Sequence, residues 1–193
     1  AREILSLRDG HPVYAPPPHH PILAWAFLLY LLGWIAFILL FPLTSTLPDR
    51  GYGISKIIGL ALFGWIGWFL ASTGVMPVSK MQGVFVLAGL LAAAGLVLRS
   101  QGRTIREFLS QKIHGLIGLE ILFLAVWGFF LIVRAYHPAV IGGEKPMNMA
   151  FINAIYRADT FPPEDPWISG YPINYYYYGQ AILSLAGRFA GLP

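Results

Sequence analysis

The chain has 193 residues, of which 56% are hydrophobic and 11% are charged, whereas ordinary soluble domains are roughly 25% charged. A soluble fold of this length could not bury so much apolar surface, so the composition excludes a soluble domain and indicates a membrane protein. The net charge of +4 comes from thirteen basic residues spread along the chain, which excludes a nucleic-acid-binding patch. Because cysteine is absent, disulfides and thiolate metal sites are also excluded.

Long apolar runs follow a proline-rich tail over residues 1–21, for which we expect an extended conformation. The region 22–136 contains four runs, each close to the roughly 17–25 residues with which a helix crosses the hydrocarbon core: 22–43, 57–75, 81–98 and 117–133. A further run begins within residues 175–193, and we interpret it as the start of a fifth transmembrane helix in a fragment of a larger protein. The sequence therefore predicts an all-α, polytopic transmembrane helix bundle with four complete spans.

Basic residues in the connection between the third and fourth runs predict the orientation of this bundle. Residues 99–114 hold four basic residues against one acid: Arg99, Arg103, Arg106, Lys112 and the acid Glu107. The positive-inside rule places this connection in the cytoplasm, together with the connection that carries Arg50 and Lys56. Residues 137–174 then form a long loop on the extracytoplasmic side, as expected for a multi-pass protein of the cell membrane.

The long loop 137–174 contains signals for a short helix and a rigid turn. Pro146 suits the first turn of a helix, because its missing N–H group would be unpaired there in any case. Apolar residues recur at helical spacing at Met147, Phe151 and Ile155, which predicts an interfacial helix over residues 147–159. The prolines and glycine of residues 161–170 prevent regular structure after it.

Four consecutive tyrosines, residues 175–178, follow this loop. Tyrosine combines an apolar ring with a polar tip, so such a run is favoured at the headgroup level of a bilayer, and one interpretation is an aromatic belt alone. A helix turns by about 100° per residue, so four helical tyrosines would cover nearly the whole circumference. In that arrangement some rings face lipid, and we expect at least one hydroxyl to face the acids of the loop.

Five motifs in this order carry a resemblance to a known family: LPDRGYG (47–53), RAYHP (134–138), GGEKPMNMAFINAI (142–155), FPPEDPW (161–167) and GYPINYYYYG (170–179). The chain resembles, over nearly its whole length after residue 22, the N-terminal part of a family of large, uncharacterised prokaryotic membrane proteins named for its YYY run. That family is similar in layout to the C-type glycosyltransferases. The resemblance implies an enzyme that uses a polyprenyl-phosphate sugar at the outer membrane face.

The resemblance also implies roles for residues of the long loop. It assigns a catalytic base or metal ligand to Glu144, a second acid to Asp165, phosphate contacts to Lys145 and Arg157, and the lipid and sugar path to Tyr175, Tyr176, Tyr177 and Tyr178. A divalent metal, if one takes part, would be held by Glu144 and Asp165. Asn148 departs from the aspartate expected after Glu-Lys-Pro-Met, and an amide cannot act as a base. The alternative for Glu144 and Lys145 is an ordinary solvated pair.

A second class of function fits the same composition. The chain could be a non-catalytic integral subunit of a larger energy-transducing or photosynthetic complex, whose helices pack against other membrane subunits or pigments. His19, His20 and His114 could then ligate haem or chlorophyll, although interface histidines are the simpler interpretation. Glu120 lies inside the fourth apolar run, where an unpaired carboxylate is costly, and we expect it to pair with a base from another helix. The length of the intact protein separates the two classes.

Overall fold

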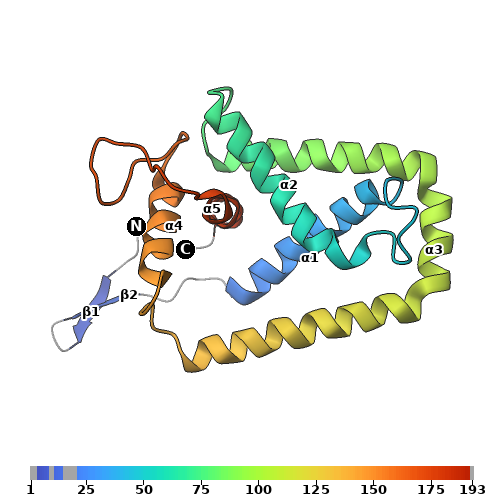
Figure 1. Cartoon of the computed structure of the whole chain (residues 1–193), viewed down its shortest axis with the longest axis horizontal. Helices are drawn as coiled ribbons and strands as arrows, with labels where there is room; N and C mark the ends of the chain where they lie inside the picture. Colours follow the sequence, from blue (N-terminus) through green and yellow to red (C-terminus); the bar gives the residue numbers. More distant parts are fainter. Residues whose placement is uncertain (1–3, 9–10, 15–20, 192–193) are drawn as a thin grey trace.

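The computed structural model describes residues 4–8, 11–14 and 21–191. Its elements, shown in Figure 1, are β1 (Ile4–Arg8), β2 (His11–Tyr14), α1 (Pro21–Leu40), α2 (Tyr52–Ser72), α3 (Lys80–Tyr136), α4 (Lys145–Arg157) and α5 (Tyr178–Ala190). The two strands form a small antiparallel hairpin within the predicted extended tail. His19 and His20 lie outside the described residues. The predicted helical class is confirmed for the rest of the described chain.

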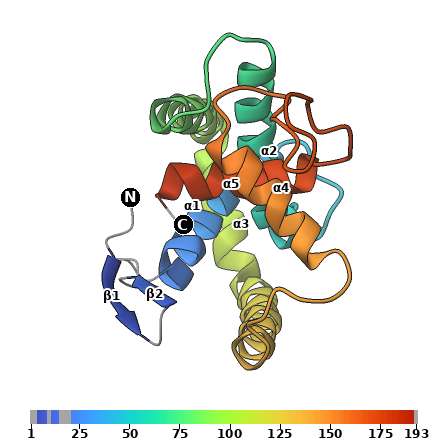
Figure 2. The same cartoon turned by 90° about the vertical axis from the view of Figure 1, so that its left-hand side faces the viewer.

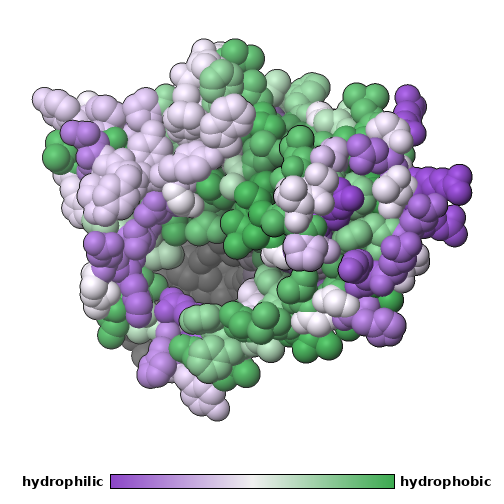
Figure 3. Space-filling model, turned by 45° about the vertical axis from the view of Figure 1, so that its right-hand side comes forward, coloured by the Kyte–Doolittle hydropathy of each residue, from purple (hydrophilic) through white to green (hydrophobic). Residues whose placement is uncertain are grey.

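Three helices, α1, α2 and α3, are long and apolar enough to cross a membrane. Within such a helix every interior backbone group is bonded internally, which is what the hydrocarbon core requires. Figure 3 shows apolar surface across the middle of the molecule, with hydrophilic residues gathered toward its two margins. We call these margins the α4 end and the turn end. The turn end contains the middle of α3 and residues 41–51, which connect α1 to α2.

The long helix α3 replaces two predicted spans and the loop between them. It has 57 residues, and Figure 1 shows that it turns twice, so that its first and last parts run in opposite directions. The prediction of a loop over residues 99–114 is therefore wrong, because these residues are helical. Ile105 is buried against Phe37 and Phe41, with Phe108 beside it, so one face of this middle part packs onto the end of α1. An apolar face without proline keeps the connection helical.

Close contact between α1 and α2 depends on small residues. A methyl group on Gly59 would lie 2.2 Å from the carbonyl oxygen of Leu32, so the two backbones touch at this point. Gly64 brings α2 against α5 in the same way, because an added methyl would lie 2.8 Å from Ile182. Small residues at helix interfaces allow this approach in membrane proteins. The main core cluster forms around these contacts, with Leu28, Leu32 and Phe63 among its buried members.

The α4 end is a separate packing unit built on α2 and α5. The helix α4 has 13 residues, which rise about 20 Å and do not span a bilayer of roughly 30 Å. It starts at Lys145, two residues before the predicted bound, and Pro146 lies in its first turn. Phe151 and Ile155 bury its apolar face in a second core cluster that also includes Ala71 and Ala181. Figure 2 shows α4 and α5 together at this end of the molecule.

Candidate functional site

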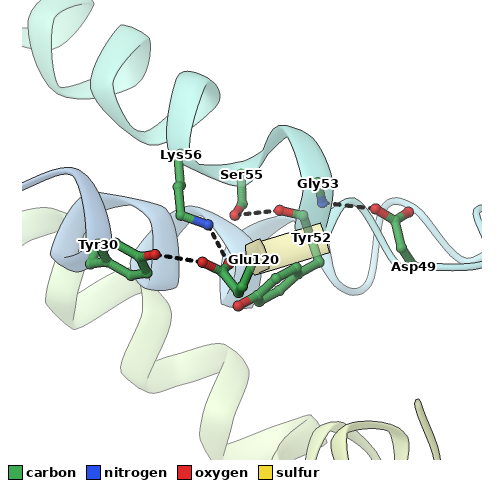
Figure 4. Close-up of polar contacts among 7 residues, drawn as sticks. All are labelled: Tyr30, Asp49, Tyr52, Gly53, Ser55, Lys56 and Glu120. Atoms are coloured by element: carbon green, nitrogen blue, oxygen red, sulfur yellow. Dashed lines mark hydrogen bonds and ion pairs between the residues drawn. The ribbon is translucent and has the colours of Figure 1, made fainter. Parts of the chain in front are cut away.

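A polar cluster lies inside the apolar core, where α1, α2 and α3 meet (Figure 4). The Nζ atom of Lys56 is 2.5 Å from Oε1 of Glu120, and the hydroxyl of Tyr30 donates to the other oxygen, Oε2, at 2.6 Å. Each oxygen of this carboxylate therefore has a partner on a different helix. The expected pairing of Glu120 with a base from another helix is confirmed.

Aromatic rings enclose the ammonium group of Lys56. Its Nζ atom lies 4.8 Å from the ring centroid of Tyr30, 5.2 Å from that of Tyr52 and 4.7 Å from that of Phe123. These distances are within the range of cation–π attraction, which is stronger where water is excluded. Gly33 makes room for the stem of Lys56, because a methyl there would lie 2.8 Å from Cγ of the lysine.

Lys56 corrects one sequence prediction. We placed it in the connection between the first two spans, but it belongs to the second turn of α2 and is only 8% exposed. Its charge therefore does not count toward the orientation of the bundle. The predicted second apolar run begins after this lysine, at residue 57. The partly buried carboxylate of Glu120, 64 positions later, makes a lysine inside the apolar helix possible.

The motif LPDRGYG (47–53) builds the start of α2. Oδ1 of Asp49 accepts from the N–H group of Gly51 at 3.1 Å, and Oδ2 accepts from Gly53 at 2.8 Å. Arg50 and Gly51 both have positive φ values, 53° and 76°, and the left-handed region favours glycine at the second position. The turn brings Tyr52 to the ring contacts around Lys56. The motif thus contributes one ring of the polar cluster and fixes its position.

Glu144 and Lys145 lie where α4 begins, and both side chains are exposed. Glu144 occupies the N-cap position, and its side chain makes no capping hydrogen bond. Asn148, which stands in place of the expected aspartate, lies in the first turn of α4. Its Oδ1 atom accepts from Nε2 of Gln180 at 2.7 Å, so the amide joins α4 to α5.

The tyrosine run does not form a helical ring. Only Tyr178 is inside α5, and its ring lies 6.0 Å from that of Trp68 in an edge-on contact. Tyr177 stacks on Phe161, with centroids 6.0 Å apart. Tyr175 and Tyr176 precede the helix and stack on each other at 4.0 Å. The prediction that all four cap the helix around its circumference is wrong, because the preceding loop continues to Tyr177.

The hydroxyl of Tyr175 lies in a polar environment at the loop surface. It donates to the hydroxyl of Tyr176 at 2.8 Å. This hydrogen bond raises the pKa of Tyr175 to about 12, and desolvation and the nearby Glu144 carboxylate contribute to the rise. The negative charge of Glu144 therefore acts on this hydroxyl pair. Among the predicted site residues, Tyr175 and Tyr176 are in direct contact, and the charge of Glu144 makes the smallest contribution to the raised pKa of Tyr175.

Asp165 and its neighbour Glu164 hold the rigid turn of the loop together. Oδ1 of Asp165 accepts from the backbone N–H groups of Trp167 and Ile168, at 2.8 and 3.1 Å. Oε1 of Glu164 accepts from the N–H group of Gly170 at 2.7 Å. Both carboxylates therefore have structural partners within six residues of the chain. The Phe161–Pro162 peptide bond in this turn is cis.

A surface cleft of about 740 Å³ lies beside the end of α4. Arg157 and Asp165 line it, together with Asp159 and Glu164. Arg157 is the last residue of α4, whereas Glu144 precedes its first turn, so the predicted pair Glu144 and Asp165 lies toward opposite ends of a helix about 20 Å long. Among the described residues, no three histidines or acids form a group that could hold a metal.

A row of hydrogen bonds from polar side chains of α5 to α4 was not predicted from the sequence. Gln180 bonds Asn148, Ser184 donates to the carbonyl of Ile152 at 3.2 Å, and Arg188 donates to the carbonyl of Tyr156 at 3.3 Å, each pair 32 positions apart. Nη2 of Arg188 also lies 2.8 Å from Oδ1 of Asp159. The sequence could have indicated these bonds, because polar residues recur every four positions along one face of an otherwise apolar helix.

The fold and the charged pair in its core define an α-helical membrane protein with several apolar helices. A family model described as "Uncharacterized membrane protein (DUF2298)" matches residues 62–193, which is more than half of the chain. The chain belongs to this family. Comparisons with curated proteins and with solved structures gave no match.

Proposed function

We propose that this protein is a glycosyltransferase-like enzyme of the cell membrane, which uses a lipid-linked sugar donor at the face that bears α4. The proposal extends from the likeness in layout to C-type glycosyltransferases. One observation carries it. Glu144 is an exposed carboxylate without a capping bond, it lies next to Lys145, and its charge acts on the hydroxyl of Tyr175, which bonds that of Tyr176.

In this proposal Glu144 acts as the general base. It takes the proton of an acceptor hydroxyl while the acceptor oxygen bonds to the anomeric carbon of the sugar. The bond from that carbon to the polyprenyl phosphate breaks, and the electron pair leaves with the phosphate. Lys145 and the free N–H groups at the start of α4 would stabilise this added negative charge. The tyrosines would line the path of the lipid and the sugar.

Arg157 and Asp165 have a separate place in the proposal. The cleft that they line is polar and large enough for a sugar, with Arg157 available for a phosphate or a hydroxyl. Asp165 already accepts two backbone N–H groups through Oδ1, which supports a role in shaping the cleft. We propose that this cleft binds the acceptor or a distal part of the donor, and that a divalent metal, if required, is held at one of the two places.

The proposal includes four membrane crossings, two of them made by α3. Its first and last parts are apolar, and the basic middle part over residues 99–114 would lie at the cytoplasmic surface. Single cysteines at Gln101 and Ser169 test this topology in sealed vesicles. We expect a membrane-impermeant reagent to label them from opposite sides. Labelling of both from one side would contradict the proposed crossings.

Transfer of labelled sugar from a polyprenyl phosphate tests the activity. Membranes that contain the intact protein should consume the donor, and Glu144→Gln should abolish this while the amount of inserted protein stays unchanged. Glu107→Gln provides the matched control, because it removes an exposed carboxylate at the turn end. Full activity of Glu144→Gln would exclude Glu144 as the base.

A specific observation favours the alternative of a non-catalytic subunit in a larger membrane complex. The last part of α3 carries large apolar side chains with little cover from the described chain, including Phe129, Phe130 and Ile132 at about 60% exposure. Such a face could pack against another membrane subunit instead of lipid. Photo-crosslinkers at Phe130 distinguish the two, because a subunit should give one discrete protein adduct and a lipid-facing helix should give none.

A further inference from the structure

A second cleft, of about 310 Å³, lies at the turn end, far from the loop discussed above. It forms where the middle part of α3 passes the connection between α1 and α2. Its polar lining comes from Asp49, Gln111, Lys112 and His114, and its apolar lining includes Leu116 and Leu119. The cleft therefore has a polar side and an apolar side.

The polar side of this cleft offers hydrogen-bond donors to an anion. Asp49 directs both carboxylate oxygens to backbone N–H groups at the start of α2, so these oxygens already have partners. Lys112 and His114 are exposed, and neither forms a hydrogen bond or an ion pair with the part of the chain that the structure describes. Their nitrogen donors are available to an anion, and Gln111 adds an amide donor beside them.

The positive charge near the cleft comes mainly from its surroundings. Arg99 and Arg106 are exposed on the same helical part, without ion-pair partners among the residues described here. Arg103 forms a pair with Glu107 at 2.9 Å, which compensates the acid of this segment. Basic groups beside a membrane attract anionic lipids, and the attraction falls off within a Debye length.

The apolar side of the cleft identifies the kind of anion. Leu116 and Leu119 continue along α3 into exposed apolar residues such as Ile117, Ile121 and Leu122, which are 48%, 63% and 60% exposed. An anion that carried acyl chains could lay them along this surface while its phosphate remained at the polar lining. A free phosphate would gain nothing from the apolar side.

We propose that this cleft is a binding site for the phosphate-bearing headgroup of an anionic lipid in the adjacent leaflet. Lys112 and His114 hold the phosphate, Gln111 bonds a headgroup oxygen, and the acyl chains lie along the last part of α3. This site is independent of the proposed glycosyltransferase function, because it shares no residue with the α4 end.

Native mass spectrometry of the intact, delipidated protein in detergent tests the site. The protein is mixed with equal amounts of phosphatidylglycerol and phosphatidylcholine, and bound lipids are counted for each variant. We expect the wild type to retain phosphatidylglycerol preferentially and Lys112→Gln to reduce this retention by about fivefold or more, the effect of one basic group at a membrane surface. His114→Gln combined with Lys112→Gln should reduce it further.

Two matched variants separate a defined site from diffuse attraction. Arg99→Gln removes one positive charge from the middle part of α3, outside the cleft. Lys80→Gln removes one positive charge from the exposed first residue of α3, far from the cleft. We expect the first to reduce retention by less than Lys112→Gln and the second to leave it unchanged. A reduction by Arg99→Gln equal to that of Lys112→Gln would overturn the proposal. So would displacement of the lipid by excess inorganic phosphate, because the ligand would then be the phosphate group alone.

Discussion

Carboxylates serve different purposes in the apolar core and in the loop that follows α4. Glu120 in the core bonds partners 64 and 90 positions away, Lys56 of α2 and Tyr30 of α1. Asp165 and Glu164 in the loop bond backbone groups within six positions. The core carboxylate therefore joins helices, whereas the loop carboxylates shape one turn. Glu144 differs from both kinds of carboxylate, because at the N-cap of α4 its side chain makes no capping hydrogen bond.

The difference follows from the solvent around each group. Within hydrocarbon an isolated charge is expensive, so a charged residue persists only with a partner, and the partner must come from whichever helix lies alongside. At an exposed loop water already solvates the charge, and a nearby N–H group is sufficient to order it. Mutations should therefore have large, global effects in the core and small, local effects in the loop.

The largest effect is expected at the buried ion pair. Glu120→Gln should lower the free energy of unfolding by about 3–5 kcal/mol, because the ammonium group of Lys56 would remain among apolar side chains without a counter-charge. Lys56→Met combined with Glu120→Met should recover most of the loss, since it removes both charges at once. Unfolding in mixed micelles, followed by circular dichroism, measures both changes.

The exposed pair of Arg103 and Glu107 is the control for this comparison. Its side chains are 93% and 55% exposed, so Glu107→Gln should change the stability by less than about 0.5 kcal/mol. If Glu120→Gln changed the stability as little as Glu107→Gln, the core cluster would not hold the helices together, and the contrast between core and loop would be lost.

The contact between α1 and α2 should give the next largest effect. Gly59→Ala places a methyl group against the backbone of Leu32, which cannot move away as a side chain could, and we expect a loss of about 1–3 kcal/mol. Gly89→Ala is the matched change, because nothing lies within 4 Å of the added methyl and the helix gains about 0.5–1 kcal/mol. The same unfolding measurement should therefore show opposite signs for the two variants. Equal signs would mean that the close approach of the two backbones does not limit packing.

A smaller and local effect is expected in the loop. Asp165→Ala removes the acceptor for the N–H groups of Trp167 and Ile168, and their hydrogen exchange should become several-fold faster, as expected when a bond worth about 1 kcal/mol is lost. Asp165→Asn keeps an acceptor oxygen and should preserve the protection. Exchange of the backbone amides in α5 should stay unchanged in both variants.

Asp165→Asn also tests the role of this acid in the proposed enzyme. The variant keeps the turn but loses the carboxylate, so a loss of sugar transfer with normal amide protection would indicate a chemical role for Asp165. Unchanged transfer, together with a loss in Asp165→Ala, would indicate that Asp165 acts only by shaping the loop.

The helices could be predicted from sequence where one physical rule decides the outcome. The apolar runs gave α1 and α2 because the requirements of the hydrocarbon core outweigh local preferences. Pro146 marked the beginning of α4 within two residues, since only the first turn of a helix accommodates it well. The short apolar repeat at Phe151 and Ile155 correctly identified the face of α4 that is buried.

The remaining features depend on contacts that the local pattern does not contain. Basic residues suggested a loop over residues 99–114, whereas the apolar face with Ile105 packs onto α1 and keeps it helical. The sequence places Lys56 in a connection because it is charged. Nothing near it in the chain reveals its partner Glu120, which is 64 positions away. Glu144 and Asp165 lie toward opposite ends of α4. This placement depends on how the loop folds back, and the prolines of the loop restrict its path but do not specify it.

The smallest effect is expected at the stacked tyrosines. There the comparison between core and loop concerns a single hydrogen bond, between the hydroxyls of Tyr175 and Tyr176. Tyr175 donates its proton to a hydrogen bond with Tyr176, and this bond is the largest cause of its pKa being raised to about 12 from the usual value near 10. A pKa raised on folding means that the stabilisation is complete below about pH 10 and is lost as the pH rises through 12. The bond should therefore contribute equally at every pH between about 5 and 9.

Absorbance of tyrosinate near pH 12, taken as the difference between wild type and Tyr175→Phe, isolates the ionisation of Tyr175. Tyr176→Phe removes the acceptor, which is the largest cause of the shift, and should move the Tyr175 transition down toward pH 10, whereas Tyr171→Phe should leave it in place. A transition that does not move in Tyr176→Phe would show that the hydroxyl pair is not bonded, and the environment proposed around Glu144 would lose its tyrosine partner.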